Sequence, residues 1–401
     1  MIVKIKNIFL CFPFLFFFDA DIKNTSEDVP FMINFSQNIP GKYITDIVED
    51  TKFIPLETSD EILIGISKVA YVSDKIIIMY NFRESSIFIF NYEGKIISNF
   101  NHRGPGPMEY SGIMGLTYDE VNKEIFVLDL IPRANVYSET GQYKRTLHFP
   151  ENTKFKEIYN FDEKHLLAYD IYDIGINWNL STEADKKAIY NKPYAFLSKT
   201  DGSITEYVNI NLSQRISTLH GSEDKSSQTI RTFGFITCGI IKSGSDFLLT
   251  DIASDTTYLL SRNKKLTPLI LRTPSVHDKN PQELISATFR TDNYILIRKW
   301  LNDSNDAKKF TDYVFDISDN LFYKVKDFNI VDLGEKITRF LYPYPDDCGC
   351  DYYDNGVIVN LWQAFDLKIM LEQGQLKGEL KNIAMNINEE DNPVLVIIKI
   401  K

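Results

Sequence analysis

Short runs of β-branched and aromatic residues recur along this chain in sets of four, and this repetition limits its possible folds more than any other feature. Each run in the first set has six or seven residues and is bounded by polar turns such as Ser73-Asp74 and Glu93-Gly94. The first set comprises Ile66–Val72, Lys75–Tyr80, Ser86–Tyr92 and Lys95–Phe100. Such a series predicts a four-stranded antiparallel meander.

The same pattern returns after a rigid segment at 101–110. The second set comprises Ile113–Tyr118, Glu124–Asp129, Ala134–Ser138 and Tyr143–Phe149. The turns Glu93-Gly94 and Thr140-Gly141 are 47 residues apart, and a period of this length with four strands in each unit is typical of a propeller blade. Four further units bring the predicted number of blades to six. They span about 155–210 with an insertion at 178–188, 232–271, 284–326, and 339–400 with a helical patch at 365–382.

The two ends of the chain are predicted to meet. Two extended stretches, Tyr43–Val48 and Lys52–Thr58, precede the first unit and have no partner beside them in sequence. A ring of blades needs its last blade completed from the other end, which also hides two sheet edges. We therefore expect residues 43–58 to share a blade with 393–400. The predicted fold is all-β: a six-bladed β-propeller over 43–401, with four-stranded antiparallel blades and a ring closed by the N- and C-terminal strands.

The first twenty residues are typical of an export signal. Lys4 and Lys6 precede an apolar run, Ile8–Phe18, which is too short to span a bilayer but suits a signal sequence. A first core strand is the alternative, although five phenylalanines within 12–18 suit a half-solvated strand poorly. Residues 1–20 are thus predicted to be a signal peptide or an N-terminal membrane segment, and 21–42 a leader. The expected location is the periplasm or the cell envelope and outer surface, with cleavage and anchoring both open.

The charge balance disfavours one class of partner. The 401 residues include 44 Lys and Arg against 55 Asp and Glu, which gives a formal net charge of −11. Such a chain repels phosphate backbones and anionic lipid headgroups. We expect no nucleic acid partner, membrane contact only through an uncleaved N-terminus, and a protein, peptide or carbohydrate ligand.

The sequence does not decide the chemical state of the cysteines. Cys11 lies within the apolar run, so Cys238, Cys348 and Cys350 form an odd set in a compartment expected to be oxidising. Cys348-Gly349-Cys350 resembles half of a metal or redox site, but the sequence has no second Cys/His cluster to complete it. A metal site, a strained disulfide and ordinary thiols are the alternatives.

The segment 101–110 is the most distinctive turn, because its prolines fix φ and its glycines can adopt positive φ. Loops that join an outer strand to the next inner strand lie on the face where propellers usually bind ligands. Arg103 and Glu109 are therefore the first candidate ligand-binding residues, since an arginine can hold a carboxylate or sugar acid by two hydrogen bonds. Tyr110 could stack on a sugar ring. The alternative is that Arg103 and Glu109 pair with each other or with a neighbouring blade.

Other candidates are less specific. Tyr342 and Tyr344 belong to a second stiff loop, which could form a carbohydrate or peptide platform or pack over the sixth blade. Asp129, Asp170 and Asp251 end comparable strands and could hold calcium or another divalent metal in the channel, or cap turns. No other cofactor is predicted. No catalytic residue is assigned, because the sequence contains neither H-E-x-x-H nor G-x-S-x-G.

Three segments resemble exported six-bladed β-propeller proteins of NHL-repeat type, a cell-envelope family of certain Gram-negative bacteria. They are the entry Phe53–Thr58, the turn Arg103–Gly106 followed by Glu109-Tyr110, and the ending Glu390–Val396. The resemblance covers roughly Tyr43 to the C-terminus. It implies a propeller and says little about activity.

The sequence is compatible with two functions. A rigid ring with varied loops and no coherent catalytic set favours a non-catalytic binding or interaction propeller of the cell envelope. The alternative is a metal-dependent lyase or lactone hydrolase with its site at the central channel, because other six-bladed propellers support such activities.

Overall fold

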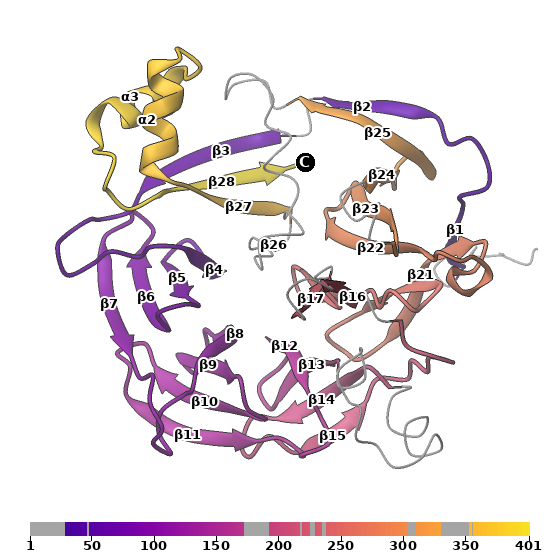
Figure 1. Ribbon diagram of the computed structural model, residues 1–401, viewed down its shortest axis with the longest axis horizontal. Coiled ribbons are helices and arrows are strands. Elements are labelled where there is room, and N and C mark those ends of the chain that lie inside the picture. The colour runs from indigo at the N-terminus through magenta and orange to yellow at the C-terminus, as the bar shows by residue number, and fades with distance from the viewer. Residues whose placement is uncertain are drawn as a thin grey trace, which may run out of the picture.

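The computed structural model is a closed ring of six β-sheets (Figure 1). It describes residues 29–45, 48–171, 192–216, 219–224, 229–234, 238–303, 310–329, 353–354 and 356–401. Four of these sheets have four strands and two have five. The predicted all-β, six-bladed propeller is therefore confirmed.

Blades 1 to 3 follow the chain in order, each from the inner strand outwards. Blade 1 consists of β4 (Ser67–Val72), β5 (Ile76–Asn81), β6 (Ser86–Asn91) and β7 (Ile96–Asn101). Blade 2 consists of β8 (Ile113–Asp119), β9 (Glu124–Asp129), β10 (Arg133–Ser138) and β11 (Tyr143–His148). Blade 3 consists of β12 (Phe155–Asn160), β13 (His165–Asp170), β14 (Tyr194–Ser198) and β15 (Ile204–Tyr207).

Blades 4 to 6 continue the ring and take strands from both ends of the chain. Blade 4 consists of β18 (Ile240–Ser243), β19 (Asp246–Leu249), β20 (Thr256–Leu260), β21 (Leu266–Thr273) and β1 (Phe31–Asn34). Blade 5 consists of β22 (Glu283–Arg290), β23 (Tyr294–Leu301), β24 (Phe310–Asp316), β25 (Leu321–Asn329) and β2 (Gly41–Thr45). Blade 6 consists of β26 (Tyr353–Asp354), β27 (Val357–Trp362), β28 (Val394–Ile400) and β3 (Val48–Pro55).

Burial explains why some strands have continuous apolar sequences and others alternate. The second and third strands of a blade are covered on both faces by neighbouring blades, so β9 is buried at every position and β6 at its four central ones. The outer strand β7 instead alternates between half-buried and exposed residues. The apolar runs seen in the sequence are therefore mostly the middle strands of blades.

Three glycines lie in turns through which blades 1 to 3 each contact the preceding blade. Gly94, Gly141 and Gly202 join the third and fourth strands of successive blades, with φ between +79° and +86°. Each turn packs on the outer strand of the preceding blade: an added Cβ would lie 2.4 Å from the carbonyl oxygen of Pro55 at Gly94, and 2.6 Å from the ring of Phe100 at Gly141. At Gly202 it would lie 2.8 Å from the backbone of β11. The 47-residue period thus marks a repeated contact between blades.

The ring closes between the N-terminal and C-terminal parts of the chain. Strand β3 pairs antiparallel with β28, from Pro55 opposite Val394 to Val48 opposite Ile400. The predicted sharing of a blade is confirmed for Val48–Pro55.

The prediction is wrong for residues 43–45, which lie in β2. This strand pairs in parallel with β25 of blade 5, and β1 pairs in parallel with β21 of blade 4. Strands β1, β2 and β3 therefore lie at the outer edges of three consecutive blades (Figure 1). An unpaired outer edge accepts any extended segment that reaches it, and such pairing covers exposed backbone groups.

Two segments depart from the four-strand pattern. A separate hairpin, β16 (Leu219–Asp224) with β17 (Thr229–Gly234), lies between blades 3 and 4 in sequence. The helical patch expected at 365–382 is present as α2 (Ala364–Glu372) and α3 (Gly378–Asn386), which stand outside the ring beside blade 6 (Figure 1). A short 3-10 helix, η2 (Val276–Asp278), precedes β22.

Within the described ranges, no helix combines the length and apolar character needed to cross a membrane. The insertion at 178–188 lies outside the described residues.

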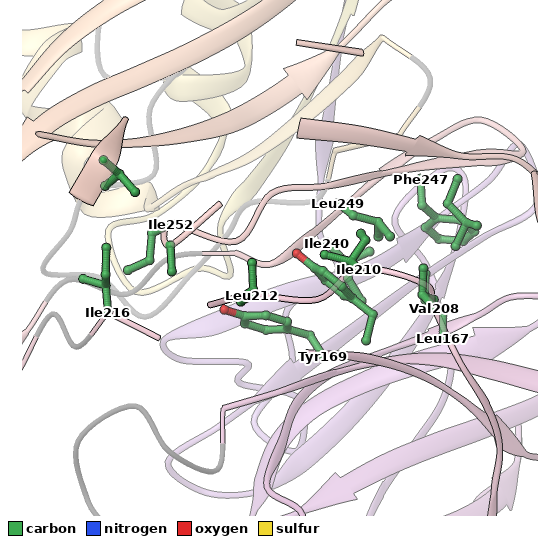
Figure 2. Packing of buried hydrophobic residues seen from close by; sticks show 14 of the residues in the cluster. Leu167, Tyr169, Val208, Ile210, Leu212, Ile216, Ile240, Phe247, Leu249 and Ile252 are labelled. Carbon is green, nitrogen blue, oxygen red and sulfur yellow. The ribbon is translucent and has the colours of Figure 1, made fainter. Parts of the chain in front are cut away.

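Blade contacts combine apolar clusters with buried polar links. Figure 2 shows one cluster between blades 3 and 4, which includes Leu167 and Tyr169 of β13 and Phe247 of β19. Between blades 2 and 3, the Lys199 ammonium donates to the Asp119 carboxylate over 2.6 Å, and both side chains are at most 6% exposed. The fold therefore depends on paired charges as well as on apolar packing.

Candidate functional site

A cavity of about 580 Å³ lies against the inner strands of four consecutive blades. Its lining comes from β4, β8, β12 and β18, together with Tyr80 of β5 and nearby loop residues. Figure 1 shows β4, β8 and β12 at the inner edge of the ring. This volume is within the usual range of small-molecule sites.

Most of the cavity wall is apolar or aromatic. The aliphatic lining residues are Val69, Ala70, Ile113, Met114, Leu116, Val121, Ile158, Ile240 and Ile241. The aromatic lining residues are Tyr71, Tyr80, Phe82, Tyr118 and Tyr159. Such a wall favours a ligand with a substantial apolar surface.

The charged lining is predominantly cationic. The basic lining residues are Lys68, Lys156, Lys242 and Arg262, and the acidic ones are Glu120 and Glu157. This balance is opposite in sign to the net charge of −11 for the whole chain. The cavity therefore differs in charge from the average surface of the protein.

Glu157 links two blades at the cavity wall. Its two carboxyl oxygens accept hydrogen bonds from the backbone N–H groups of Gly239 at 2.8 Å and Ile240 at 3.1 Å. Burial raises the pKa of the Glu157 carboxyl above its ordinary value, against the opposing effects of Lys156 and the two N–H groups. This carboxyl therefore holds β18 against β12 and carries its negative charge less readily than an exposed glutamate.

A tyrosine pair forms another part of the wall. Tyr71 and Tyr118 make an edge-to-face contact with ring centroids 4.9 Å apart. The Tyr71 hydroxyl donates to Glu120 over 2.9 Å, and the Tyr118 hydroxyl donates to Glu139. Burial, followed by these carboxylates, raises the pKa of both tyrosines. Both hydroxyls thus stay protonated at neutral pH and orient their rings along the wall.

A polar contact joins blades 4 and 6 next to the cavity. The Lys242 ammonium donates to the Asp354 carboxylate over 2.5 Å, and the N–H of Gly244 donates to the other carboxylate oxygen over 2.9 Å. Lys242 therefore contributes to the cavity wall while it holds the short strand β26 in place.

The turn 101–110 has a structural role in this fold. Tyr110 is fully buried, and its hydroxyl donates to the carbonyl of Ser85 and accepts from the N–H of His102. Burial raises the pKa of Tyr110 to about 12. The expectation that this ring stacks on a sugar is not supported, because the ring has no exposed surface.

Glu109 also acts within the turn. Its carboxylate accepts from the N–H of Gly106 over 2.7 Å, and it lies so close to Gly104 that an added Cβ would come within 2.1 Å of it. Arg103 is exposed and donates to the carbonyl of Arg83 over 3.2 Å. Glu109 thus stabilises the turn, whereas Arg103 presents its guanidinium to solvent on the loop face. The cavity lining does not include either residue.

The remaining sequence candidates have different outcomes. Tyr342, Tyr344, Cys348 and Cys350 lie outside the described residues. Cys238 is at the cavity wall and is disulfide-bonded.

The strand-end aspartates make local contacts. Asp129 accepts from Ser111 and pairs with Arg133 at 2.8 Å, and Asp170 accepts from the N–H of Lys154. Asp251 accepts from the Tyr169 hydroxyl. Within the described part of the chain, no three His, Cys, Asp or Glu side chains are grouped so that they could hold a metal ion. The described side chains therefore supply no ligand set for the metal considered from the sequence.

Sequence reasoning missed the basic residues of the cavity. Lys68 and Lys156 are each the second residue of an inner strand, β4 and β12 respectively. Both line the cavity, but a β-bulge at Lys156 shifts the register of β12, so a comparison of the units in sequence does not place the two lysines together. The sequence gives no comparable signal for Arg262, which comes from a loop between outer strands.

Solved structures that are similar to this chain have low sequence identity to it. A protein from Bacteroides fragilis NCTC 9343 named "Putative exported protein" has a TM-score of 0.60 and 16% identity, with 92% of this chain and 99% of that chain covered. A member of the DUF4221 family from Bacteroides vulgatus ATCC 8482 has a TM-score of 0.47 and 11% identity, with 88% and 97% covered. The first of these supports the fold.

A more distant similarity is to virginiamycin B lyase from Staphylococcus aureus, with a TM-score of 0.37, 12% identity, and 88% and 99% of the two chains covered. No curated protein matches the sequence. The family model described as "Domain of unknown function (DUF4934)" matches residues 31–399. This match extends from β1 into β28, and the chain therefore belongs to the DUF4934 family.

Proposed function

We propose that this protein is a non-catalytic binding propeller of the cell envelope, and that its ligand occupies the cavity at the inner strands of blades 1 to 4. The observation that carries the proposal is the cavity of about 580 Å³ itself, which combines apolar walls with four basic side chains. Pockets of this kind, with a few polar groups on an apolar wall, are the usual form of small-molecule sites.

Binding is favoured over catalysis by the way the polar wall groups are used. Both oxygens of Glu157 accept backbone hydrogen bonds, and the hydroxyl groups of Tyr71 and Tyr118 donate to carboxylates. Groups held in this way orient strands and rings. They suit a preformed wall that binds a ligand without reorganisation.

Filling the cavity should weaken ligand binding without unfolding the ring. Gly115 lines the cavity, and a Cβ added there would have its nearest neighbours at 3.8 and 3.9 Å, which is ordinary contact. We expect Gly115→Leu to weaken binding at least tenfold. The measurement is a thermal-shift screen of small molecules on the wild type, followed by titration of each hit against the variant.

The matched control places extra bulk outside the cavity. Ile97 lies on the outer strand β7 and is 55% exposed. Ile97→Trp should bind every hit as the wild type does. Hits that bind equally to Gly115→Leu would show that the ligand site is elsewhere, and a screen that yields no hit would count against a small-molecule function.

Export is part of the proposal, as is the NHL-repeat type of the blades. The apolar run Ile8–Phe18 and the name of the similar Bacteroides fragilis protein both support export. A reporter fused to residues 1–30 should leave the cytoplasm, and changing Lys4 and Lys6 to glutamate should reduce its export severalfold, because signal sequences need a positive start. Fractionation of cells with and without detergent measures both effects. A reporter retained in the cytoplasm by the native segment would contradict the proposal.

The second candidate function is the lyase or lactone hydrolase at the central channel. One observation favours it: Glu157 is a carboxyl with a raised pKa at the wall of a cavity, as general acids often are. Native mass spectrometry for bound metal, followed by ligand titration with and without a chelator, distinguishes the two functions. Metal-dependent turnover would favour the enzyme.

A further inference from the structure

Two of the four basic side chains at the cavity wall are held in ion pairs. The Lys156 ammonium lies 4.0 Å from the carboxylate of the adjacent Glu157. The Lys242 ammonium pairs with the Asp354 carboxylate, as described above. Both of these cations therefore have an acidic partner within the protein.

The other two basic side chains lie near aromatic rings. The Lys68 ammonium is 5.1 Å from the ring centroid of Phe82. The Arg262 guanidinium is 5.8 Å from the ring centroids of both Phe161 and Phe247. Aromatic faces attract cations at such distances. All four basic lining residues thus have attractive contacts within the protein, and the wall does not require a negatively charged ligand.

Three tyrosine hydroxyls of the wall are also used within the protein. Those of Tyr71 and Tyr118 donate to carboxylates. The Tyr159 hydroxyl donates to the carbonyl of Ile240 over 3.3 Å. Burial raises the pKa of all three tyrosines, so their hydroxyls stay protonated at neutral pH. These residues therefore offer a ligand their rings and not a charge.

The wall suits an apolar molecule better than a sugar. Sugar rings present hydroxyl groups on their edges, and these groups need polar side chains as partners. Among the lining residues, Asn160 is the one amide, whereas nine aliphatic residues and five aromatic residues surround the space. Burial of apolar surface, which drives binding in such a cavity, is greater for an apolar ligand than for a saccharide.

Aromatic side chains of blades 1 and 3 lie on either side of the inner strand of blade 2. Tyr71 of β4 and Phe82, which follows β5, belong to blade 1, and Tyr159 of β12 belongs to blade 3. All three are half-buried, so part of their surface is accessible. Between these blades, β8 contributes Met114 and Leu116, which are half-buried too (Figure 1). A methionine thioether makes favourable contacts with aromatic rings.

Gly115 leaves room on the same strand. It lines the cavity between Met114 and Leu116, and a Cβ added to it would have its nearest neighbours at 3.8 and 3.9 Å. Because glycine has no side chain, a ligand can approach the backbone closely at this point. A planar ring suits such an approach better than a bulky saturated one.

We propose that the ligand of this cavity is a neutral, largely apolar molecule with a planar aromatic ring system, which lies on β8 between the aromatic side chains of blades 1 and 3. This inference rests on the proposed binding function and specifies its ligand class. Aromatic rings attract one another beyond the effect of apolar burial. A planar aromatic ligand therefore gains more from this wall than a saturated ligand of the same size.

The first test concerns the charge of the ligand. N-phenyl-1-naphthylamine is neutral, and anilinonaphthalenesulfonate has the same ring system with an added sulfonate. Both are titrated into the full-length protein and followed by their fluorescence. We expect one molecule of the neutral probe to bind per chain, at least tenfold more tightly than the sulfonate. Tighter binding of the sulfonate would overturn the neutral class.

The second test concerns the aromatic ring. 2-Naphthol and its saturated counterpart decahydro-2-naphthol share a skeleton and a hydroxyl group, and each is used to displace the neutral fluorescent probe. We expect 2-naphthol to bind about fivefold more tightly or better, because only its rings interact as aromatic pairs with those of the wall. Equal or tighter binding of the saturated alcohol would overturn the aromatic class.

Paired substitutions test the position of the ring. Tyr71→Leu together with Phe82→Leu should raise the Kd for 2-naphthol at least fivefold and leave the Kd for the saturated alcohol within about twofold. The matched control is Tyr207→Leu together with Phe365→Leu, two exposed aromatic residues outside the cavity lining. It should change neither Kd by more than about twofold. An unchanged Kd for 2-naphthol in the Tyr71/Phe82 variant, or an equal loss of both ligands, would overturn the proposed role of these rings.

The outcomes separate the ligand class from the proposed function. If the sulfonate or the saturated alcohol bound more tightly and Gly115→Leu weakened that binding, the cavity would remain the binding site for a ligand of another class. If no probe bound but the thermal-shift screen gave hits that Gly115→Leu weakened, the ligand class alone would be contradicted. If the screen also gave no hit, both the ligand class and the binding function would be contradicted.

Discussion

Removal of residues 1–58 should yield a chain that aggregates or lacks a cooperative unfolding transition. Strand β3 covers the edge of β28, and the segment contributes the buried side chains Ile33, Ile54 and Leu56, each at most 4% exposed. At about 1.5 to 3 kcal/mol for each buried large apolar side chain, the three residues contribute about 5 to 9 kcal/mol. That is comparable to the whole net stability of a domain, roughly 5 to 15 kcal/mol. Thermal unfolding followed by circular dichroism measures the effect.

Two shorter deletions act as graded controls. Removal of residues 1–30 leaves β1, β2 and β3 intact, so the melting temperature should stay within about 2 °C of that of the full chain, since a loss of 1 kcal/mol shifts it by roughly 2 to 4 °C. Removal of residues 1–45 deletes the parallel outer strands β1 and β2 but keeps β3, and should destabilise the ring less than the longest deletion. Cooperative melting of the 59–401 chain at the temperature of the first control would show that β3 does not close the ring.

Replacing Lys199 by methionine should destabilise the protein by about 3 to 5 kcal/mol at pH 7, the usual cost of leaving a buried charge without its partner. The Lys199 ammonium donates to the Asp119 carboxylate and to the carbonyl of Asp162, each over 2.6 Å. With methionine at this position, the carboxylate of Asp119 would stay buried between blades 2 and 3 without its cation. Urea unfolding at a series of pH values measures the change.

The pH dependence of this loss has a definite sign. Burial alone would raise the pKa of Asp119, but hydrogen bonds from Lys199 and Asn122 outweigh burial and hold the pKa below 3.8. In the wild type the ionised carboxylate therefore stabilises the fold above about pH 4, and this contribution is lost as the pH falls through the lowered pKa. In Lys199→Met, burial would dominate and the pKa of Asp119 would rise. The variant should thus be closer to the wild type in stability at pH 4.5 than at pH 7.

A second substitution checks this explanation. Asp119→Asn in the Lys199→Met background removes the buried charge and keeps an oxygen that can accept the N–H groups of Val121 and Asn122. It should restore part of the stability at pH 7 and remove the added pH dependence. A double variant as unstable as Lys199→Met at every pH would mean that packing, and not charge, explains the loss.

The number of blades and most of their strands could be predicted because both depend on local patterns. Turns such as Glu93-Gly94 and Thr140-Gly141 need glycine for positive φ, and the strands between turns are rich in residues that suit buried sheets. The helical patch near 365–382 could also be predicted, because a helix too depends on the residues within its own segment. These features need no information from distant parts of the chain.

The candidate site was predicted less well, because it depends on contacts between distant residues. The turn 101–110 is distinctive in sequence, yet Tyr110 is buried and Glu109 holds the turn together. The sequence does not distinguish an aromatic loop residue that faces a ligand from one that faces the core. Lys68 and Lys156 are separated by 88 residues, and their common place at the cavity appears only when the inner strands are aligned in space.

The sequence by itself determined the repeat, the all-β blades and the meeting of the two ends, since periodicity and turn chemistry are local and a ring must hide its edges. Only the tertiary structure decided which edges the N-terminal strands cover: β3 closes blade 6, whereas β1 and β2 add parallel strands to blades 4 and 5. It also decided where charge and apolar surface meet to form the cavity. Edge pairing and cavity lining both arise from which surfaces remain uncovered after the blades have packed, and no local pattern in the chain contains that information.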